Sequence, residues 1–321
     1  MASRYFRNMV ILAKIETTAG TYLAPAAATD ALLISDATIS YDDKIVERDL
    51  LRPYFGAAEQ LMGDSPVNLE FTVELAGSGT AGTVPAWGKL LRACAMAETV
   101  TAGSYVIYNP ITNSQEAISF LYAVDGVTHR VKGARGTAVM SIAPGAKPVI
   151  KFKFVGIEQA DPEATANPTG VVLTAWKAPL PVAAVNTGDI VTGCTYATGA
   201  VTGGTTLPSI SMELDLGGSP EFMTLLGSSE VDITAREIKA TAKMRLEAAS
   251  EVTMFTDAKT VTTKTMAFKH GTGAGKIVQF YAPAAQFGRP KYENAQGRMA
   301  VSVDMRMCPV SGNDELLIIV K

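Results

Sequence analysis

Apolar and polar residues alternate strictly along residues 67–75, and the rest of the chain is organised around this stretch. Successive side chains of a strand point to opposite faces of a sheet, so a period of two indicates a strand with one buried face. The apolar positions are Val67, Leu69, Phe71, Val73 and Leu75. We expect a half-buried strand here, in a chain whose other segments are also mainly typical of strands and turns.

A short amphipathic helix is predicted over residues 85–97, after a run of small residues. Its first residue, Pro85, suits the first turn of a helix because that position needs no backbone N–H. Apolar side chains then follow at the spacing of one helical face: Trp87, Leu90, Leu91 and Cys94. We expect this face to pack against a sheet.

The alternating pattern returns 171 residues later in the chain. Residues 37–75 and 208–246 keep one apolar register without a gap, and this alignment places Ile39 on Ile210. Any two alternating strands can be aligned somewhere, so the order of the neighbouring elements has to decide whether the match is a true repeat.

That order is the same in both halves. Each repeated stretch is followed by a predicted helix, at 85–97 and at 250–260. Each helix is followed by closing strands, around 118–122, 149–157, 277–281 and 299–307. We interpret the chain as two tandem domains, residues 1–158 and 170–321, joined by a polar, proline-containing linker at 159–169.

Further strands and turns complete the pattern. Residues 9–13 predict a short first strand, and residues 316–320 are wholly apolar and predict a buried last strand. Turn-forming residues separate the strands of the first half, at 109–110, 125–126, 133–136 and 144–145.

Residues 42–66 predict an interaction loop. They mix charged residues with large apolar ones and show neither helical nor strand periodicity for most of their length. A loop this long inside a compact domain is unusual and tends to be functional. Aromatic residues close to arginine are typical of interface hot spots. The contact residues that we expect are Arg48, Leu50, Leu51, Arg52, Tyr54 and Phe55.

Composition narrows the classes of function. Hydrophobic residues make up 47% of the chain and charged residues only 18%, which suits a protein whose surface is largely covered by neighbours. The formal net charge of −3 offers no basic field for nucleic acid.

Three widely spaced cysteines argue against a disulfide framework and favour a reducing compartment. Residues 9–13 are too short an apolar run for a signal peptide or a membrane span, so we expect a cytoplasmic protein until assembly.

Catalytic and metal-binding patterns are not found in the sequence. His129 and His270 lie in separate halves, and no cysteine pair has metal or redox spacing. Residues 271–276 look like a phosphate loop but lack the full spacing, and Ile277 stands where a serine or threonine should bind magnesium. We therefore expect no enzyme activity, no cofactor and no metal.

The strand at 67–75, the charged and apolar loop before it and the helix after it resemble the major tail tube proteins of long-tailed, siphovirus-like bacteriophages. The second copy matches this arrangement over residues 210–246. The resemblance implies a mainly β fold of two tandem β-sandwich or barrel-like tail tube domains, each with one flanking α-helix. A single domain is usual in that family, whereas some relatives fuse two.

The same resemblance implies a structural virion protein located in the tail and assembled in the host cytoplasm. Its first partner would be itself, as a homotrimeric ring with pseudo-sixfold symmetry that stacks into a tube. Other tail proteins (tape measure, terminator and distal tail) would join it, and DNA would pass through the lumen without specific binding. No membrane is implied. Two alternatives stay open at this point: another virion or surface-lattice subunit, such as a capsid decoration or tail terminator protein, and an enzymatic or carbohydrate-binding β-sandwich.

Overall fold

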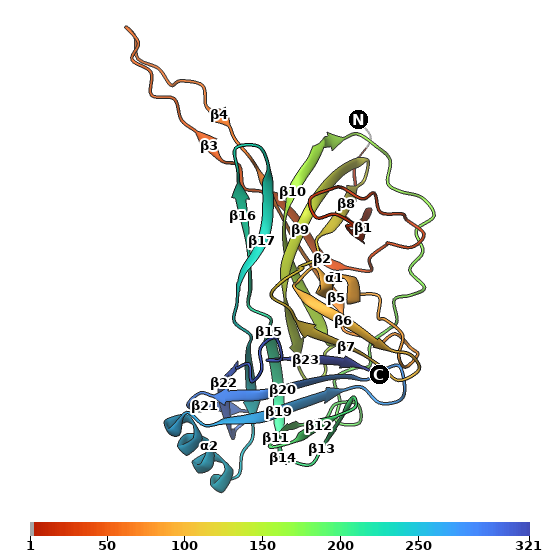
Figure 1. The fold of residues 1–321 in the computed structure, drawn as a ribbon, viewed down its shortest axis with the longest axis vertical. Helices are drawn as coiled ribbons and strands as arrows, with labels where there is room; N and C mark the ends of the chain where they lie inside the picture. The colour runs from red at the N-terminus through yellow and green to blue at the C-terminus, as the bar shows by residue number, and fades with distance from the viewer. Residues whose placement is uncertain (1–2) are drawn as a thin grey trace.

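The computed structural model describes residues 3–321 and shows a mainly antiparallel β protein with two short helices (Figure 1). Seventeen strands belong to one hydrogen-bonded network, and three further pairs of strands stand apart from it. The first half contains β1 (Met9–Ile15), β2 (Ser35–Tyr41), β3 (Ile45–Val46), β4 (Leu61–Met62), β5 (Pro66–Glu74), α1 (Gly88–Arg92), β6 (Met96–Thr101), β7 (Tyr105–Pro110), β8 (Ile118–Val124), β9 (Val127–Ile142) and β10 (Val149–Glu163).

The second half repeats the alternation of strands around one helix. It contains β11 (Ile190–Thr192), β12 (Thr195–Ala197), β13 (Ala200–Thr202), β14 (Thr205–Leu207), β15 (Ser209–Asp215), β16 (Gly218–Thr224), β17 (Ser229–Arg236), β18 (Lys239–Met244), α2 (Ala248–Thr260), β19 (Thr263–His270), β20 (Val278–Phe287), β21 (Lys291–Ala295), β22 (Arg298–Met307) and β23 (Leu317–Val320).

One antiparallel sheet runs through both halves without a break. Its strand order is β2-β5-β10-β9-β15-β18-β22-β21, and the junction between the halves is the pairing of β9 with β15. The alternating pattern of β5 makes the two faces different, because Leu69, Phe71 and Val73 are buried while Glu70 and Thr72 between them point to the other face. The strand predicted at 67–75 is thus confirmed.

A second junction involves the C-terminal strand. β23 pairs with β20 of its own half and with β7 of the first half, so the sheet order around it is β19-β20-β23-β7-β6. Its residues Ile318, Ile319 and Val320 are almost completely buried. This confirms the predicted buried last strand and shows that it packs within the same subunit.

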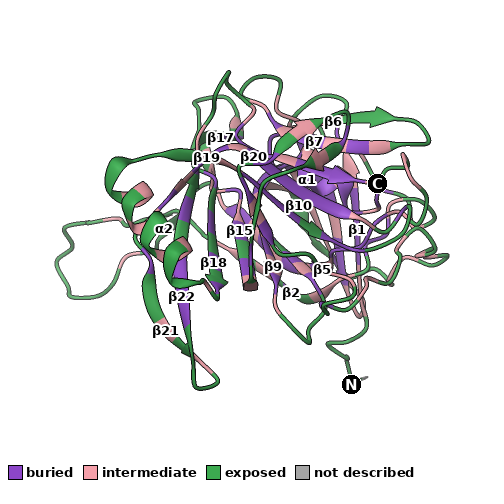
Figure 2. Cartoon of the chain, turned by 90° about the horizontal axis from the view of Figure 1, so that it is seen from below, coloured by how far each residue is buried: buried purple, intermediate pink, exposed green. Residues whose placement is uncertain are grey.

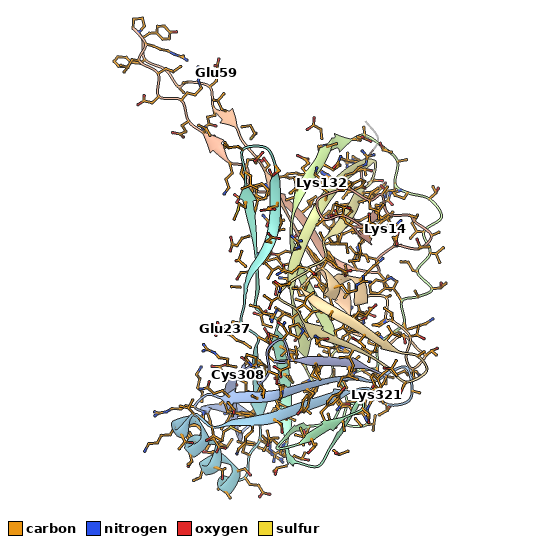
Figure 3. The ribbon with its side chains drawn as sticks, viewed as in Figure 1. Lys14, Glu59, Lys132, Glu237, Cys308 and Lys321 are labelled. Atoms are coloured by element: carbon orange, nitrogen blue, oxygen red, sulfur yellow. The ribbon has the colours of Figure 1, made fainter. Side chains whose placement is uncertain are left out.

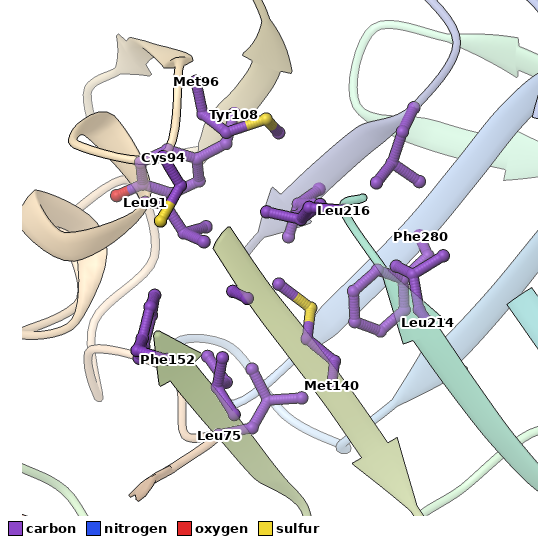
Figure 4. Close-up of a cluster of buried hydrophobic side chains, with 14 of the residues drawn as sticks. Leu75, Leu91, Cys94, Met96, Tyr108, Met140, Phe152, Leu214, Leu216 and Phe280 are labelled. Carbon is purple, nitrogen blue, oxygen red and sulfur yellow. The ribbon is translucent and has the colours of Figure 1, made fainter. Parts of the chain in front are cut away.

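The core of the molecule is continuous across the two halves. One cluster of buried side chains extends from Leu75 and Phe152 in the first half to Leu214 and Phe280 in the second (Figure 4). Figure 2 shows the buried residues gathered where the strands of the two halves cross. Tandem sandwiches with separate cores are therefore not resolved, and the fold is a mainly β molecule with one large antiparallel network.

The first helix is shorter than predicted, although its buried face is confirmed. Only Gly88–Arg92 is α-helical, because Ala95 adopts a left-handed backbone with φ 55° and β6 begins at Met96. Trp87, Leu90, Leu91 and Cys94 are nonetheless all buried against the sheets. The helix predicted at 250–260 is confirmed as α2 (Ala248–Thr260).

Three other expectations need correction. Residues 109–110 and 133–136 do not form turns but lie within β7 and β9, and β10 extends to Glu163, into the range assigned to the linker. The ungapped repeat also fails at its first strand. Ile39 lies opposite Leu69, whereas the repeat-related Ala240 lies opposite Leu214, so Ile39 corresponds to Leu214 and not to Ile210.

Candidate assembly surfaces

The predicted interaction loop forms an arm that projects away from the rest of the molecule (Figure 1). β2 and β5 pair with each other, and the chain between them leaves the sheet as a hairpin whose two sides meet in the short ladder of β3 and β4. Ser65 Oγ donates a hydrogen bond of 2.6 Å to Asp43 Oδ1 at the base of the arm. This ladder has no detectable periodicity in the sequence because each strand is only two residues long.

The six predicted contact residues all lie on this arm, beyond the ladder. Arg48 reaches across the hairpin to Glu59, with 3.2 Å between Nη1 and Oε2 (Figure 3 labels Glu59). Leu51 and Phe55 have relative exposures of 102% and 108%, so neither side chain is covered by its own subunit. The other three, Leu50, Arg52 and Tyr54, are also exposed. Exposed apolar patches are typical of contact surfaces, and the exposure of this tip leaves it free to contact a partner.

A second hairpin, formed by β16 and β17, was not singled out in the sequence although it occupies the equivalent place between β15 and β18. Its tip exposes Met223, Leu225 and Leu226, the last at 112%. Buried Arg135 of β9 anchors the hairpin by donating hydrogen bonds to the Val231 carbonyl and the Asp232 carboxylate. The adjacent leucines at 225–226, inside the stretch predicted as a second copy, were the signal that could have identified it.

The two hairpins touch near the base of the arm. Ser229 Oγ, at the start of β17, donates a hydrogen bond of 3.2 Å to Asp64 Oδ2. Both hairpins extend toward the same end of the molecule in Figure 1, and α2 lies at the opposite end. The molecule therefore has two unlike ends, one with projecting apolar tips and one without them.

The open face of the eight-stranded sheet carries ion pairs between neighbouring strands. Glu70 of β5 lies 3.4 Å from Lys151 and 3.5 Å from Lys153 of β10. In the second half, Lys243 pairs with Glu293 and Lys291 with Asp304, each at 2.7 Å.

Hydrogen bonding from Lys291 and Thr241 lowers the pKa of the Asp304 carboxyl, which keeps it charged. Glu237 serves two cations, Lys239 at 2.9 Å and Arg306 at 2.5 Å. The cations named on this face thus each have a carboxylate partner.

Groups suited to catalysis or metal binding do not come together within residues 3–321. No cluster of metal-ligating side chains occurs in this part of the chain. His129 is held by Tyr41, with 2.7 Å between Nδ1 and the phenol oxygen, while His270 lies in the other half against Thr187. The residues 271–276 connect β19 to β20 and open no helix. Neither described helix is long and apolar enough to cross a membrane.

Comparison with known protein families identifies the class of protein. The family described as phage tail tube protein matches residues 7–307, nearly the whole chain. A comparison with individually curated proteins gave no match. The chain therefore belongs to the phage tail tube protein family. It is a structural, non-enzymatic subunit of the virion tail that assembles with itself into the tube, which sets aside the capsid decoration, terminator and enzymatic alternatives.

Proposed function

We propose that three copies of this chain close into a ring with pseudo-sixfold symmetry, in which each copy supplies two equivalent units. The observation that carries this proposal is a repeated order of strand pairing. In the first half the order is β2-β5-β10-β9-β8-β1. In the second half it is β15-β18-β22-β20-β19-β11, and all of these pairings are antiparallel.

A duplicated unit explains this order better than coincidence does. The hairpins that leave the sheet occur at the same step, between β2 and β5 and between β15 and β18. A helix follows at the same later step, α1 after β5 and α2 after β18. Six equivalent strands in one order, with insertions at matching places, support a tandem origin from one tube domain.

The open face of the eight-stranded sheet is suited to line the lumen. If this sheet closes into a barrel around a water-filled channel, its polar face should turn toward the channel and its apolar face toward the flanking strands. Free lysines and arginines would hold DNA through its phosphates, and their affinity would impede passage. The cations named on this face lie next to carboxylates, two of them beside Glu70 and two beside Glu237, so these ion pairs would compete with DNA phosphates for the cations.

The arm is suited to join one ring to the next in a tail of the long, siphovirus-like type. Its six contact residues, Arg48, Leu50, Leu51, Arg52, Tyr54 and Phe55, lie away from the sheet and project toward one end of the molecule. A head-to-tail contact between unlike ends has no natural stop, so it generates a tube. Tape measure, terminator and distal tail proteins would then bind at the lumen and at the two ends of the tube.

The mass of a single ring tests the proposal. Tubes dissociated to rings under mild denaturant and weighed by native mass spectrometry should give three copies of the 33.8 kDa chain. Six copies would contradict the proposed pseudo-sixfold ring. Electron microscopy of the same rings, viewed along the axis, should show six similar lobes.

A further inference from the structure

The eight-stranded sheet ends in two unpaired edges, β2 and β21. Within residues 3–321, β2 pairs only with β5, and β21 pairs only with β22. An unpaired edge offers a row of backbone donors and acceptors to another strand. We propose that β21 of one copy pairs antiparallel with β2 of the next, an inference that rests on the proposed ring. The register would be the one in which β9 pairs with β15 inside the chain.

The position of β21 follows from counting across the sheet. Met140 on β9 lies in the same cross-strand row as Val73, two strands away. Met244, which the 171-residue repeat aligns with Val73, lies in the same row as Tyr292, also two strands away. β22 pairs with β21 near its N-terminal end and with β20 near its C-terminal end, so β20 and β21 together take the place of the long strand β9. Tyr292 therefore holds on β21 the place that Met140 holds on β9.

The position of β2 follows in the same way from the other side of the internal junction. Met140 lies opposite Leu214 on β15, and Leu214 lies opposite Ala240 on β18. The repeat aligns Ala240 with Leu69, and Leu69 lies opposite Ile39. Ile39 therefore holds the place of Leu214, and Tyr292 of one copy should lie opposite Ile39 of the next.

The phase of the backbone hydrogen bonds supports this register independently. Along a strand, the backbone groups of successive residues point alternately to the two neighbouring strands. Asp42 donates its N–H to Pro66 on the β5 side, so the groups of Ile39 point to the free edge. The pair Ala295 and Arg298 closes a two-residue turn with positive φ at both turn residues, so the groups of Ala295 face β22 and those of Tyr292 face outward.

The internal junction has the same phase. Leu216 donates its N–H to the Ala138 carbonyl across the junction, so these two residues form a hydrogen-bonded pair. Met140 and Leu214 face each other two residues away on the same two strands, so they are a hydrogen-bonded pair as well. If β21 and β2 were shifted by one residue, backbone N–H and C=O groups that point to the free edge of one strand would face groups that point into the sheet on the other. The proposed register avoids that mismatch, and it also brings Arg289 level with Asp42 just beyond β21.

The flanking residues give a direct test by cysteine cross-linking. In this register Thr38 lies opposite Glu293, and Ser40 lies opposite Lys291. Directly opposite residues have Cα atoms about 4.5–5.5 Å apart, within the reach of a disulfide, whereas diagonal residues are about 7–8 Å apart and beyond it. Cys308 is partly exposed and is replaced by serine in the background used, while Cys94 and Cys194 are buried.

Four double variants are assembled into tubes and oxidised. The matched pairs are Thr38→Cys with Glu293→Cys and Ser40→Cys with Lys291→Cys. The mismatched pairs, Thr38→Cys with Lys291→Cys and Ser40→Cys with Glu293→Cys, contain the same four substitutions in the other combination. We expect covalent oligomers on non-reducing gels from the matched pairs and at least tenfold less from the mismatched pairs.

The outcomes separate this inference from the ring proposal. Cross-linking of the matched pairs supports the register. The largest covalent oligomer then gives the number of chains in the ring: three chains agree with the proposed ring, and six chains mean that only the ring proposal fails. Cross-linking of the mismatched pairs, or of no pair in tubes that have assembled, overturns the register. A double variant that does not assemble is mixed at one part in ten with a single-cysteine variant that does assemble. The single cysteine stands at one of the two positions of the tested pair.

Discussion

At the scale of single residues, the buried face of the first helix controls stability. Leu91 is completely buried in the continuous core, close to Cys94 and Tyr108 (Figure 4). Leu91→Ala should lower the free energy of unfolding by about 2–5 kcal/mol, because it removes packed atoms and leaves a cavity. Urea denaturation of the disassembled protein measures this change. Leu51→Ala on the exposed arm is the control, expected within about 0.5 kcal/mol of wild type, and an equal loss in both variants would contradict the assignment.

The two histidines predict a dependence of stability on pH. Burial is the main cause that lowers the pKa of both His129 and His270 in the folded protein. The unfolded chain therefore binds more protons as the pH falls through about 6.5, the ordinary value for histidine. The resulting stability is present above that pH and is lost below it.

Denaturation of the disassembled protein at pH 8 and at pH 5.5 measures this loss. The double variant His129→Gln with His270→Gln should show a smaller difference between the two pH values than wild type. An unchanged difference would assign the pH dependence to other groups.

At the scale of elements, we expect the two projecting hairpins to determine how the proposed rings stack. Tyr54→Ser with Phe55→Ser removes the aromatic groups from the tip of the arm, where both side chains are exposed and support nothing within their own subunit. The subunit should keep its melting temperature but fail to form long tubes, as seen by negative-stain microscopy. Polymerisation at the wild-type critical concentration would show that the arm is not the stacking element.

The second hairpin provides the matched comparison. Leu225→Ser with Leu226→Ser makes the same kind of change at the tip of β16 and β17. If only this variant loses long tubes, stacking belongs to the second hairpin. If both lose them, the two hairpins act together, which their contact through Ser229 and Asp64 makes physically reasonable.

At the scale of the whole molecule, the halves should unfold together. The junctions β9–β15 and β7–β23, together with the shared core, couple them. We expect one calorimetric transition whose calorimetric and van't Hoff enthalpies agree. A fragment of residues 1–158 should aggregate, because it loses β15 and β23 and exposes Met140 and Ile142. A fragment that melts cooperatively as a soluble monomer would contradict this coupling.

The sequence by itself determined the local elements and the exposed arm. Period-two alternation depends only on neighbouring residues, so β5, the last strand and the face of α1 could be predicted, and so could the arm's lack of any such pattern. The absence of catalytic spacing in the sequence agrees with the non-enzymatic family to which the chain belongs. The tube family was also reached from the order of these local elements.

Only the tertiary structure decided how the halves join. Whether β9 ends at an edge or continues onto β15 depends on residues about seventy positions away, and no local pattern encodes that pairing. Gly136 shows the same limit at one residue. It lies in β9, contrary to the predicted turn, because it pairs with Phe154 of β10. A Cβ there would clash first with the Lys153 carbonyl and would lie 2.6 Å from the ring of Phe154, so the glycine makes room for the neighbouring strand. Its sequence neighbours favour a turn, and pairing with the neighbouring strand overrides them.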